Sequence, residues 1–316
     1  MNNIPSVDLS DFLSDDPNRK QKFVNEIGKA YEEIGFVALR GHFLSDNLVD
    51  NLYKEIKNFF SLPLETKHTY EIEGIGGQRG YVSFGKESAK GKKEGDLKEF
   101  WHFGQYVEND PKLKAEYPDN VTVNELPEFN KVGKETYKML EKTGVYVLRA
   151  LALFLDLDEY YFDNYVKNGN SILRPIHYPP ITSEPKDAVR AAAHGDINLI
   201  TLLMGSHGKG LQVQNHHGDW LDAIAQPEEL VINVGDMLQR HSNNRLKSTI
   251  HRVVNPPREK WGTSRYSIPF FMHPISEMPL NCLDNCIDAE HPKSYDDITA
   301  GAFLNERLIE LGLIKK

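Results

Sequence analysis

The apolar residues in the first half of the chain recur at helical spacing in three segments. The first segment, 18–34, ends before Gly35, and the second follows Ser45, a residue type that favours the N-cap of a helix. The third and longest segment covers about 129–155. Between the first two, "FVALRG" at 36–41 is a short apolar run typical of a buried strand. The N-terminal part is therefore predicted to be mostly helical.

The pattern changes at about residue 171, and from there to about 275 the apolar runs are short. Examples are "INLITLLMG", "GLQVQN", "ELVINVGDML" and "STIHRVVNP", which are separated by Gly, Pro and Asn. Many short strands at near-regular spacing indicate a sandwich or a barrel. The final segment, "DITAGAFLNERLIELGL", returns to helical spacing. We therefore expect a fold that is mainly β with flanking helices.

One long segment, residues 73–104, fits neither pattern. It holds many Gly and Lys residues and has aromatic residues at its end. We expect a long loop that leads into a strand at 98–104, with "KGKKEGDLKE" at 90–99 forming a solvated charged part of the loop. Loops of this length often carry function, so the segment is a candidate for a binding role.

Composition narrows the classes of function. A formal net charge of −9 argues against a nucleic-acid binder and against binding to an acidic membrane surface. The N-terminus has no signal-peptide pattern, and no apolar run approaches the roughly 20 residues that a spanning helix needs. Cys282 and Cys286 lie outside any metal motif and are expected to be free thiols. We expect a cytoplasmic protein with a small-molecule partner, and the sequence leaves its oligomeric state open.

The candidate chemistry centres on "AAAHGDINLITLL", residues 191–203, which sets His194 and Asp196 within apolar sequence. Burying two ionisable groups is costly unless a cation or hydrogen bonds compensate for them. Alternate side chains of a strand share a face, so this pair is predicted to project together, and His251 lies on another predicted strand. Two His and one carboxylate form the facial triad of non-haem Fe(II) oxygenases, which leaves coordination positions open for a cosubstrate and dioxygen.

A second pair of polar residues follows in "RYS", where Arg265 and Ser267 would share one face of a strand. A guanidinium fork next to a hydroxyl suits one end of a dicarboxylate. The sequence therefore predicts an anion site on a strand near the triad.

From "HGD" through "HRVVNP" to "RYS", the chain resembles the iron- and 2-oxoglutarate-dependent dioxygenases of the isopenicillin N synthase-like superfamily. "LRPIHYPP", "GLQV" and "NVGDML" also fall in the family's order and spacing, and the resemblance extends over nearly the whole chain. It implies a double-stranded β-helix, or jelly roll, at 166–280. The resemblance further implies an N-terminal region at 1–125, a supporting helix at 126–165 and a closing helical segment at 281–316.

The resemblance also implies roles for single residues. Arg265 and Ser267 would hold the distal carboxylate of 2-oxoglutarate, and Tyr178 matches a tyrosine that often contacts this cosubstrate. Ile176 stands where plant members frequently have Asn, which removes part of the polar contact to the cosubstrate. Ascorbate is a candidate reductant, O2 is the oxidant, and the ligands of Fe(II) would be His194, Asp196 and His251.

Substrate contacts are expected from "QRGYVSFG", which aligns with a segment that lines the substrate pocket in isopenicillin N synthase-like enzymes. Arg79 is predicted to bind a substrate carboxylate, with Tyr81 or the cluster Phe100, Trp101 and His102 nearby. A loop-anchoring role for Arg79 is the alternative. The substrate is accordingly expected to be a carboxylated or amino-acid-derived small molecule.

The predicted function is oxidation of a C–H bond of a small molecule, by hydroxylation, desaturation or oxidative ring closure, with release of succinate and CO2. An iron oxidase of the isopenicillin N synthase type, which does not use 2-oxoglutarate, is the first alternative. Such relatives keep the Arg and Ser pair and use it on their own substrate's carboxylate. A non-catalytic ligand-binding protein on the same fold is a more remote alternative.

Overall fold

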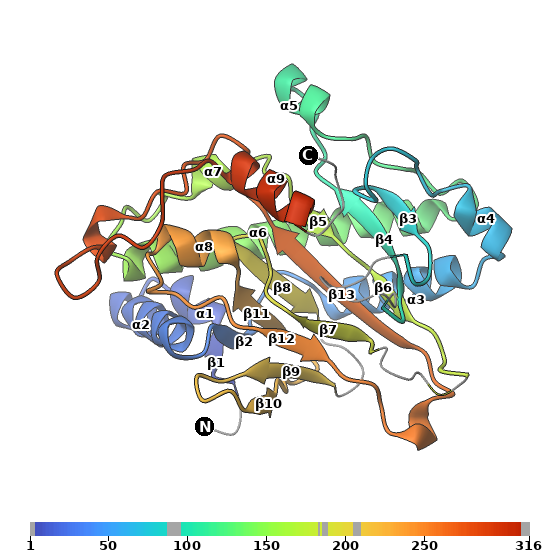
Figure 1. The fold of residues 1–316 in the computed structure, drawn as a ribbon, viewed down its shortest axis with the longest axis horizontal. Coiled ribbons are helices and arrows are strands. Elements are labelled where there is room, and N and C mark those ends of the chain that lie inside the picture. The colour runs from blue at the N-terminus through green and yellow to red at the C-terminus, as the bar shows by residue number, and fades with distance from the viewer. Residues whose placement is uncertain (1–3, 87–95, 183, 185–188, 205–209, 311–316) are drawn as a thin grey trace.

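Two facing β-sheets form the centre of the computed structural model, which describes residues 4–86, 96–182, 184, 189–204 and 210–310 (Figure 1). In the described part, the smaller sheet has the strand order β10-β9-β12-β7 and the larger sheet the order β1-β2-β11-β8-β13-β5-β4-β3, with β6 pairing with β13 and β4. The small sheet contains β7 (Ala191–His194), β9 (Leu211–Gln214), β10 (Trp220–Asp222) and β12 (His251–Val253). The large sheet contains β1 (Ser6–Asp8), β2 (Phe36–Arg40), β3 (Gly80–Val82), β4 (Glu99–Gly104), β5 (Ile172–Leu173), β6 (Ile176–Tyr178), β8 (Ile200–Met204), β11 (Leu230–Val234) and β13 (Arg265–Met272).

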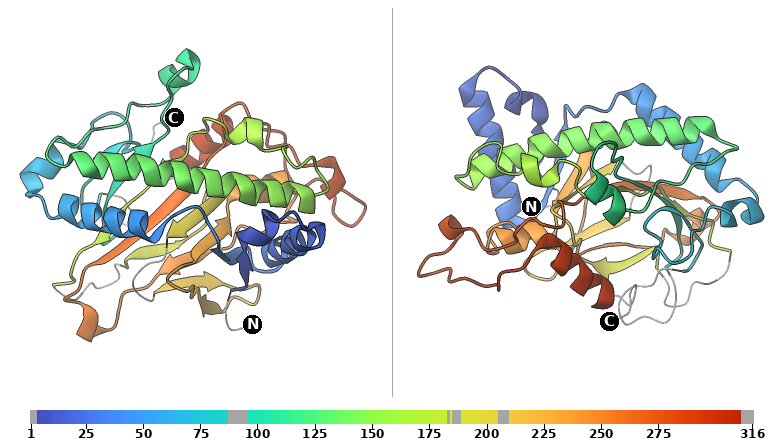
Figure 2. Two further views of the ribbon diagram at one scale, coloured as in Figure 1. Left: turned by 180° about the vertical axis from the view of Figure 1, so that it is seen from behind. Right: turned by 90° about the horizontal axis from the view of Figure 1, so that it is seen from above.

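Helices cover the outer face of the large sheet, and the longest of them crosses its strands (Figure 2). The helices of the N-terminal part are α1 (Leu9–Phe12), α2 (Pro17–Glu33), α3 (Asp46–Phe60), α4 (Leu64–His68), α5 (Pro111–Glu116) and α6 (Pro127–Phe154). Those that follow are α7 (Asp163–Val166), α8 (Asp236–His241) and α9 (Ala300–Glu310), with 3₁₀ turns at Arg258–Lys260 and Asp284–Cys286. No described helix is both long and apolar enough to cross a bilayer.

Helix α6 docks closely on the large sheet because two of its positions are glycine. A Cβ at Gly133 would lie 2.3 Å from Cζ of Phe103, and one at Gly144 would lie 2.3 Å from Sδ of Met272. Glycine within a helix costs roughly 0.5–1 kcal/mol relative to alanine, and here the cost is offset by packing against β4 and β13. The helix lies where the periodicity placed it, and the side chain of Ser45 caps α3 as predicted by accepting a 3.3 Å hydrogen bond from the backbone N–H of Leu48.

Strand β13 presents its two faces to two different environments. Phe270 packs edge-on against Tyr137 of α6, with ring centroids 5.0 Å apart, and Met272 meets the same helix. Because alternate residues of a strand point to opposite faces, Arg265 and Ser267 face the space between the two sheets. The alternation thus gives β13 an apolar outer face and a polar inner one.

The predicted fold class is confirmed, since the molecule is mainly β, has a jelly-roll core and carries flanking helices. The prediction for 90–99 was wrong in its last part, because Asp96, Lys98 and Glu99 are buried rather than solvated. Lys98 forms a 2.9 Å ion pair with Asp96, which offsets part of the cost of burying both charges. Residues 90–95 lie outside the described part of the chain, and the four-part division at 125, 165 and 280 stays a prediction.

Candidate active site

The structure brings His194, Asp196 and His251 together between the two sheets. Each offers a ligand atom within 4.8 Å of those of the other two. Oδ1 of Asp196 lies 3.9 Å from Nε2 of His194 and 3.7 Å from Nε2 of His251. Two imidazole nitrogens and one carboxylate oxygen that converge in this way can hold one divalent transition-metal ion on one face of its coordination sphere. Among the described residues, no other group of three or more His, Cys, Asp or Glu side chains converges like this.

The way in which the chain brings the triad together differs from the prediction. His194 is the last residue of β7, and Asp196 lies in the connection to β8 rather than on the same strand. The two histidines are instead direct neighbours across a ladder, because His251 of β12 pairs with His194 of β7. Their ring centroids are 4.5 Å apart. The prediction that His194 and Asp196 share one strand was therefore wrong, although their side chains do converge.

Two hydrogen bonds fix the carboxylate of Asp196. Oδ2 accepts a 2.6 Å bond from Oγ1 of Thr201 and a 2.8 Å bond from Nδ2 of Asn233. Burial raises the pKa of Asp196, but the two histidines and these two donors outweigh it, so that its pKa lies below the usual value. Oδ1 is thus left on an ionised carboxylate and faces both imidazoles. Thr201 and Asn233 come from β8 and β11, and the sequence analysis did not single them out.

The two imidazoles are oriented by backbone carbonyl groups. Nδ1 of His194 lies 2.7 Å from the carbonyl oxygen of Ala192, and Nδ1 of His251 lies 3.1 Å from that of Thr249. If each Nδ1 carries the proton and donates it to the carbonyl, each Nε2 keeps a lone pair for a metal ion. Desolvation by the protein around the ring and the neighbouring His251 lower the pKa of His194, although part of its side chain remains open to solvent. Its side chain is 45% exposed, against 10% for His251 and 5% for Asp196, so the triad opens on the His194 side.

Arg265 lies beside Tyr178, and Ser267 shares its face of β13, while the role of the three residues in binding 2-oxoglutarate stays a prediction. Arg265 pairs with Tyr178 in the ladder between β13 and β6, and its Cζ is 5.1 Å from the centroid of the tyrosine ring. Arg265 is only 4% exposed, yet none of its three guanidinium nitrogens has a hydrogen-bond partner among the described residues. An unpaired buried guanidinium is costly, so this arrangement indicates a site for an anion from outside the chain. Such a site fits one carboxylate of 2-oxoglutarate.

A second buried arginine, which the sequence analysis missed, lies at the same tyrosine. Arg190 precedes β7 directly, and its Cζ is 5.6 Å from the centroid of the Tyr178 ring. Burial and the charge of Arg265 lower the pKa of Arg190 to about 10. "VRAAAH" gave no sign of this placement, because the contact depends on how β7 and β6 are brought together.

Arg174 is a further cation on this side of the large sheet. Its guanidinium lies over the rings of Phe100 and Phe271, 4.5 and 5.1 Å from their centroids, and its Nε donates a 2.5 Å hydrogen bond to Nε2 of His102. Nδ1 of His102 is 2.7 Å from the carbonyl oxygen of Gly77, so one neutral tautomer satisfies both contacts. Of the predicted aromatic cluster, Phe100 and His102 thus contact an arginine.

Arg79 and Tyr81, the two predicted substrate residues, are fully buried and have other partners. Arg79 donates hydrogen bonds to the carbonyl oxygen of Gln78 and to Oδ1 of Asn170, at 2.7 and 3.2 Å. Its guanidinium lies over Gly104, where a Cβ would be 1.8 Å from Cζ of the arginine. These contacts favour the loop-anchoring alternative for Arg79, and its role in substrate binding stays a prediction.

Tyr81 belongs to a buried polar network around Glu99. The hydroxyl of Tyr81 donates to Oε2 of Glu99, and Nζ of Lys67 donates to the same oxygen at 2.8 Å. Oε1 of Glu99 is 2.7 Å from Nδ1 of His177, whose Nε2 is 2.9 Å from Oγ of Ser264. The network therefore joins α4, β3 and β4 to β6 and the start of β13, the strands that carry Tyr178 and Arg265.

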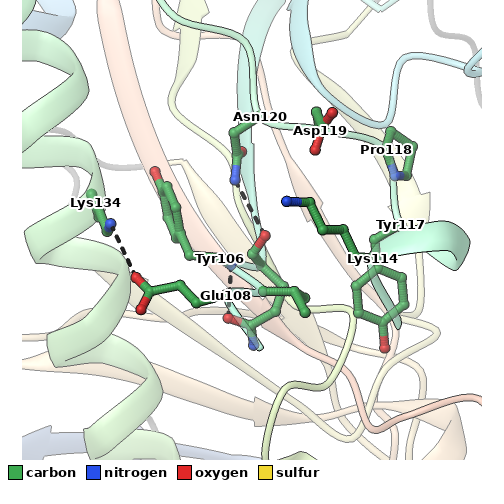
Figure 3. A pocket seen from close by; sticks show the side chains of 10 residues that line it. Tyr106, Glu108, Lys114, Tyr117, Pro118, Asp119, Asn120 and Lys134 are labelled. Atoms are coloured by element: carbon green, nitrogen blue, oxygen red, sulfur yellow. Dashed lines mark hydrogen bonds and ion pairs between the residues drawn. The ribbon is translucent and has the colours of Figure 1, made fainter. Parts of the chain in front are cut away.

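A surface hollow of about 390 Å³ lies apart from these candidate site residues (Figure 3). None of the predicted site residues lines it. Its charged groups are partly paired, since Nζ of Lys134 lies 3.8 Å from Oε1 of Glu108, and Asn120 is bound to the backbone of Gly104. This hollow therefore adds nothing to the triad or to the arginines near it.

Sequence comparison gives matches over most of the chain. Residues 169–274 match the profile of the 2OG-Fe(II) oxygenase superfamily, and residues 4–125 match that of the N-terminal region of a non-haem dioxygenase in morphine synthesis. The 2-oxoglutarate-Fe(II) type oxidoreductase hxnY of Emericella nidulans is 33% identical over 95% of this chain and 89% of its own length. The proline hydroxylase buaE of Petromyces alliaceus is 30% identical over 97% and 99% of the two chains.

Solved structures also match over most of the chain. A 2OG-Fe(II) oxygenase family protein from Caulobacter crescentus is 44% identical, with a TM-score of 0.89 and coverage of 98% of this chain and 99% of its own. A full-length Neurospora crassa protein, solved in complex with alpha-KG, is 31% identical with a TM-score of 0.84, over 96% and 95% of the two chains. Together with the convergent triad and the unpaired Arg265, these similarities show that the chain belongs to the 2OG-Fe(II) oxygenase superfamily and is an Fe(II)- and 2-oxoglutarate-dependent oxygenase.

Proposed function

We propose that the protein oxidises a C–H bond of a small carboxylated molecule, with His194, Asp196 and His251 as the iron ligands. The observation that carries the proposal is the anion site beside the triad. Arg265 is buried without a partner for its guanidinium among the described residues, and it lies on the inner face of the strand that also carries Ser267. An iron site that takes neither a cosubstrate carboxylate nor a substrate carboxylate would not require this unpaired charge.

The residues fit the two groups that the family uses. Two imidazoles and one carboxylate suit Fe(II), and a guanidinium next to a hydroxyl suits a carboxylate. When bound, Fe(II) and 2-oxoglutarate supply the chemistry that activates O2 and breaks the C–H bond, with release of succinate and CO2. The chain orients the carboxylate of Asp196 through Thr201 and Asn233, and it anchors the distal end of the cosubstrate at Arg265.

The substrate class is inferred from Arg174 and the aromatic rings around it. Arg174 lies over Phe271, which shares the inner face of β13 with Arg265, so a cation and two aromatic rings line this side of the site. Rings and a guanidinium together suit a small molecule with an apolar body and a carboxylate. Among the relatives, one is named for proline, which carries a carboxylate, and the Neurospora crassa protein has been solved with thymine, which does not. Hydroxylation is the outcome we propose first, because buaE is named as a hydroxylase.

The first experiment is anaerobic titration of the Fe(II) protein with 2-oxoglutarate, followed by the visible charge-transfer band of a 2-oxo acid chelated to iron. We expect a band in the wild type, no band in Asp196→Ala because iron binding is lost, and a much weaker response in Arg265→Met. Iron binding without any band in the wild type would contradict the proposal and favour an oxidase that does not use 2-oxoglutarate.

A second experiment tests the substrate class. Succinate release above the uncoupled background is measured with matched pairs of small molecules, each as the free carboxylate and as its amide. We expect stimulation by carboxylates, and we expect Arg174→Gln to raise their KM with little effect on the affinity for 2-oxoglutarate. Equal stimulation by carboxylates and amides would show that the substrate's charge is not recognised.

A further inference from the structure

Two buried arginines lie against one tyrosine ring, and one of them, Arg190, precedes His194 of the candidate triad by four residues. Cζ of Arg265 and Cζ of Arg190 are 5.1 and 5.6 Å from the centroid of the Tyr178 ring. Each arginine is 4% exposed and the tyrosine 2%. Arg190 directly precedes β7, Tyr178 ends β6 and Arg265 begins β13, so both sheets contribute to the cluster.

Neither guanidinium is neutralised by the described part of the chain. Arg190 and Arg265 form no ion pair with a described carboxylate, and Nε of Arg190, like all three guanidinium nitrogens of Arg265, has no hydrogen-bond partner there. The neighbouring buried acids are already paired, since Asp96 binds Lys98 and Glu99 binds Lys67. Two buried cations therefore lie against the same ring without a counter-ion among the described residues.

Without a bound anion, the two unpaired cations destabilise the folded chain. Like charges in surroundings of low polarity repel each other strongly, and the proximity of Arg265 contributes to lowering the pKa of Arg190. An anion placed between two guanidinium groups removes this repulsion and gains charge-assisted hydrogen bonds. The distal carboxylate of 2-oxoglutarate, which Arg265 is positioned to bind, is such an anion.

We propose that Arg190 is a second cosubstrate-recognising residue, which acts with Arg265 beside Tyr178 to hold the distal carboxylate of 2-oxoglutarate. The consequence is selectivity: the pocket binds a 2-oxo acid tightly only when the acid carries a second carboxylate at the far end. Arg190 is thus distinct from Arg265 and Ser267, because it comes from the opposite sheet. The inference rests on the placement of the cosubstrate in the proposed function.

The test compares two ligands that differ only at the distal end. 2-Oxoglutarate and 2-oxovalerate have the same five-carbon chain, but 2-oxovalerate has a methyl group in place of the second carboxylate. Dissociation constants are measured for both on the Fe(II) protein under nitrogen, by calorimetry and by the charge-transfer band. We expect Arg190→Met to weaken the binding of 2-oxoglutarate by about tenfold or more, as for a lost charge-assisted hydrogen bond. The affinity for 2-oxovalerate should stay unchanged. Arg190→Lys should fall between the wild type and Arg190→Met.

Arg252→Met is the matched control, because Arg252 lies on β12, beside β7, and stacks on Trp220 with Nε bonded to Gln212. It should leave both constants unchanged. Thermal unfolding of each variant without ligand verifies the fold, and Arg190→Lys keeps the test decisive if Arg190→Met does not fold. An equal loss for both ligands, an unchanged affinity for 2-oxoglutarate, or an effect only on substrate KM would overturn the inference. A wild type that binds neither ligand would instead overturn the proposed function, and the inference with it.

Discussion

Thr201 donates a 2.6 Å hydrogen bond from its hydroxyl to Oδ2 of Asp196, which leaves Oδ1 directed at the two histidines of the triad. The residue lies on the inner face of β8 and is 3% exposed. The donor fixes the rotation of the carboxylate, and groups that orient a metal ligand commonly change metal affinity by 10- to 100-fold when they are lost.

We therefore expect Thr201→Val to weaken Fe(II) binding by about tenfold, because valine has a similar shape but no hydroxyl, while Asn233 still supports the carboxylate. Competition with a chromophoric chelator under nitrogen measures the affinity. Thr201→Ser keeps the hydroxyl and should bind iron like the wild type. If Thr201→Val and the wild type bind iron equally well, the hydrogen bond from Thr201 does not orient the carboxylate of Asp196.

The network around Glu99 gives a prediction for stability. Glu99 is 4% exposed and forms an ion pair with Lys67, so Glu99→Gln leaves a buried ammonium without its counter-charge. Breaking a buried ion pair from one side costs roughly 3–5 kcal/mol. We expect a loss of that order in the free energy of unfolding, measured with urea. The double variant Lys67→Met/Glu99→Gln should recover part of the loss, and a strictly additive double variant would contradict the pairing.

The same carboxyl predicts a dependence of stability on pH. Burial raises the pKa of Glu99, but hydrogen bonds from His177, Lys67 and Tyr81 outweigh it and lower the pKa below the usual 4.5. A carboxyl with a depressed pKa stabilises the fold above its unfolded pKa, and the contribution is lost as the pH falls towards its folded pKa. Unfolding free energies measured from about pH 6 to below pH 4.5 should therefore decline less steeply in Glu99→Gln than in the wild type. Parallel declines would show that Glu99 does not titrate in this range.

Gly104 and Arg79 give a prediction for the anchored loop. A Cβ at position 104 would lie 1.8 Å from Cζ of Arg79, a guanidinium that is fully buried. Gly104→Ala is expected to cost about 1–3 kcal/mol, as overpacking does elsewhere, with the loss read from thermal or urea unfolding. Gly262→Ala is the matched control, because no atom of the described residues would lie within 4 Å of its Cβ. A stable Gly104→Ala variant would show that Arg79 can move aside.

Arg79→Met separates anchoring from substrate binding. Because Arg79 is bonded to Gln78 and Asn170, we expect this variant to unfold at lower temperature than the wild type. Substrate KM is measured at a temperature where the variant is folded. A raised KM with unchanged stability would favour the original prediction, in which Arg79 binds a substrate carboxylate.

The sequence by itself determined where several helices and strands lie and which polar residues share one face of a strand. Alternation along one strand placed Arg265 and Ser267 on a common face, because that relation depends only on the period of two residues. Helical spacing likewise located α3 and α6, since an amphipathic helix is defined by neighbours within its own segment. "HGD" and the later histidine also identified the triad, even though Asp196 lies beyond the end of β7.

Only the tertiary structure decided how residues that lie far apart in the chain meet. The ladder between β7 and β12 sets His194 opposite His251, and the packing of the two sheets brings Arg190 to the ring that Arg265 contacts. Arg79 is buried over Gly104 for the same kind of reason. Strand pairing and burial depend on many contacts between segments that are distant in the sequence. No local pattern in the sequence therefore encodes them. The three members of the candidate metal site could therefore be located from the sequence, whereas the second arginine and the partners of Asp196 could not.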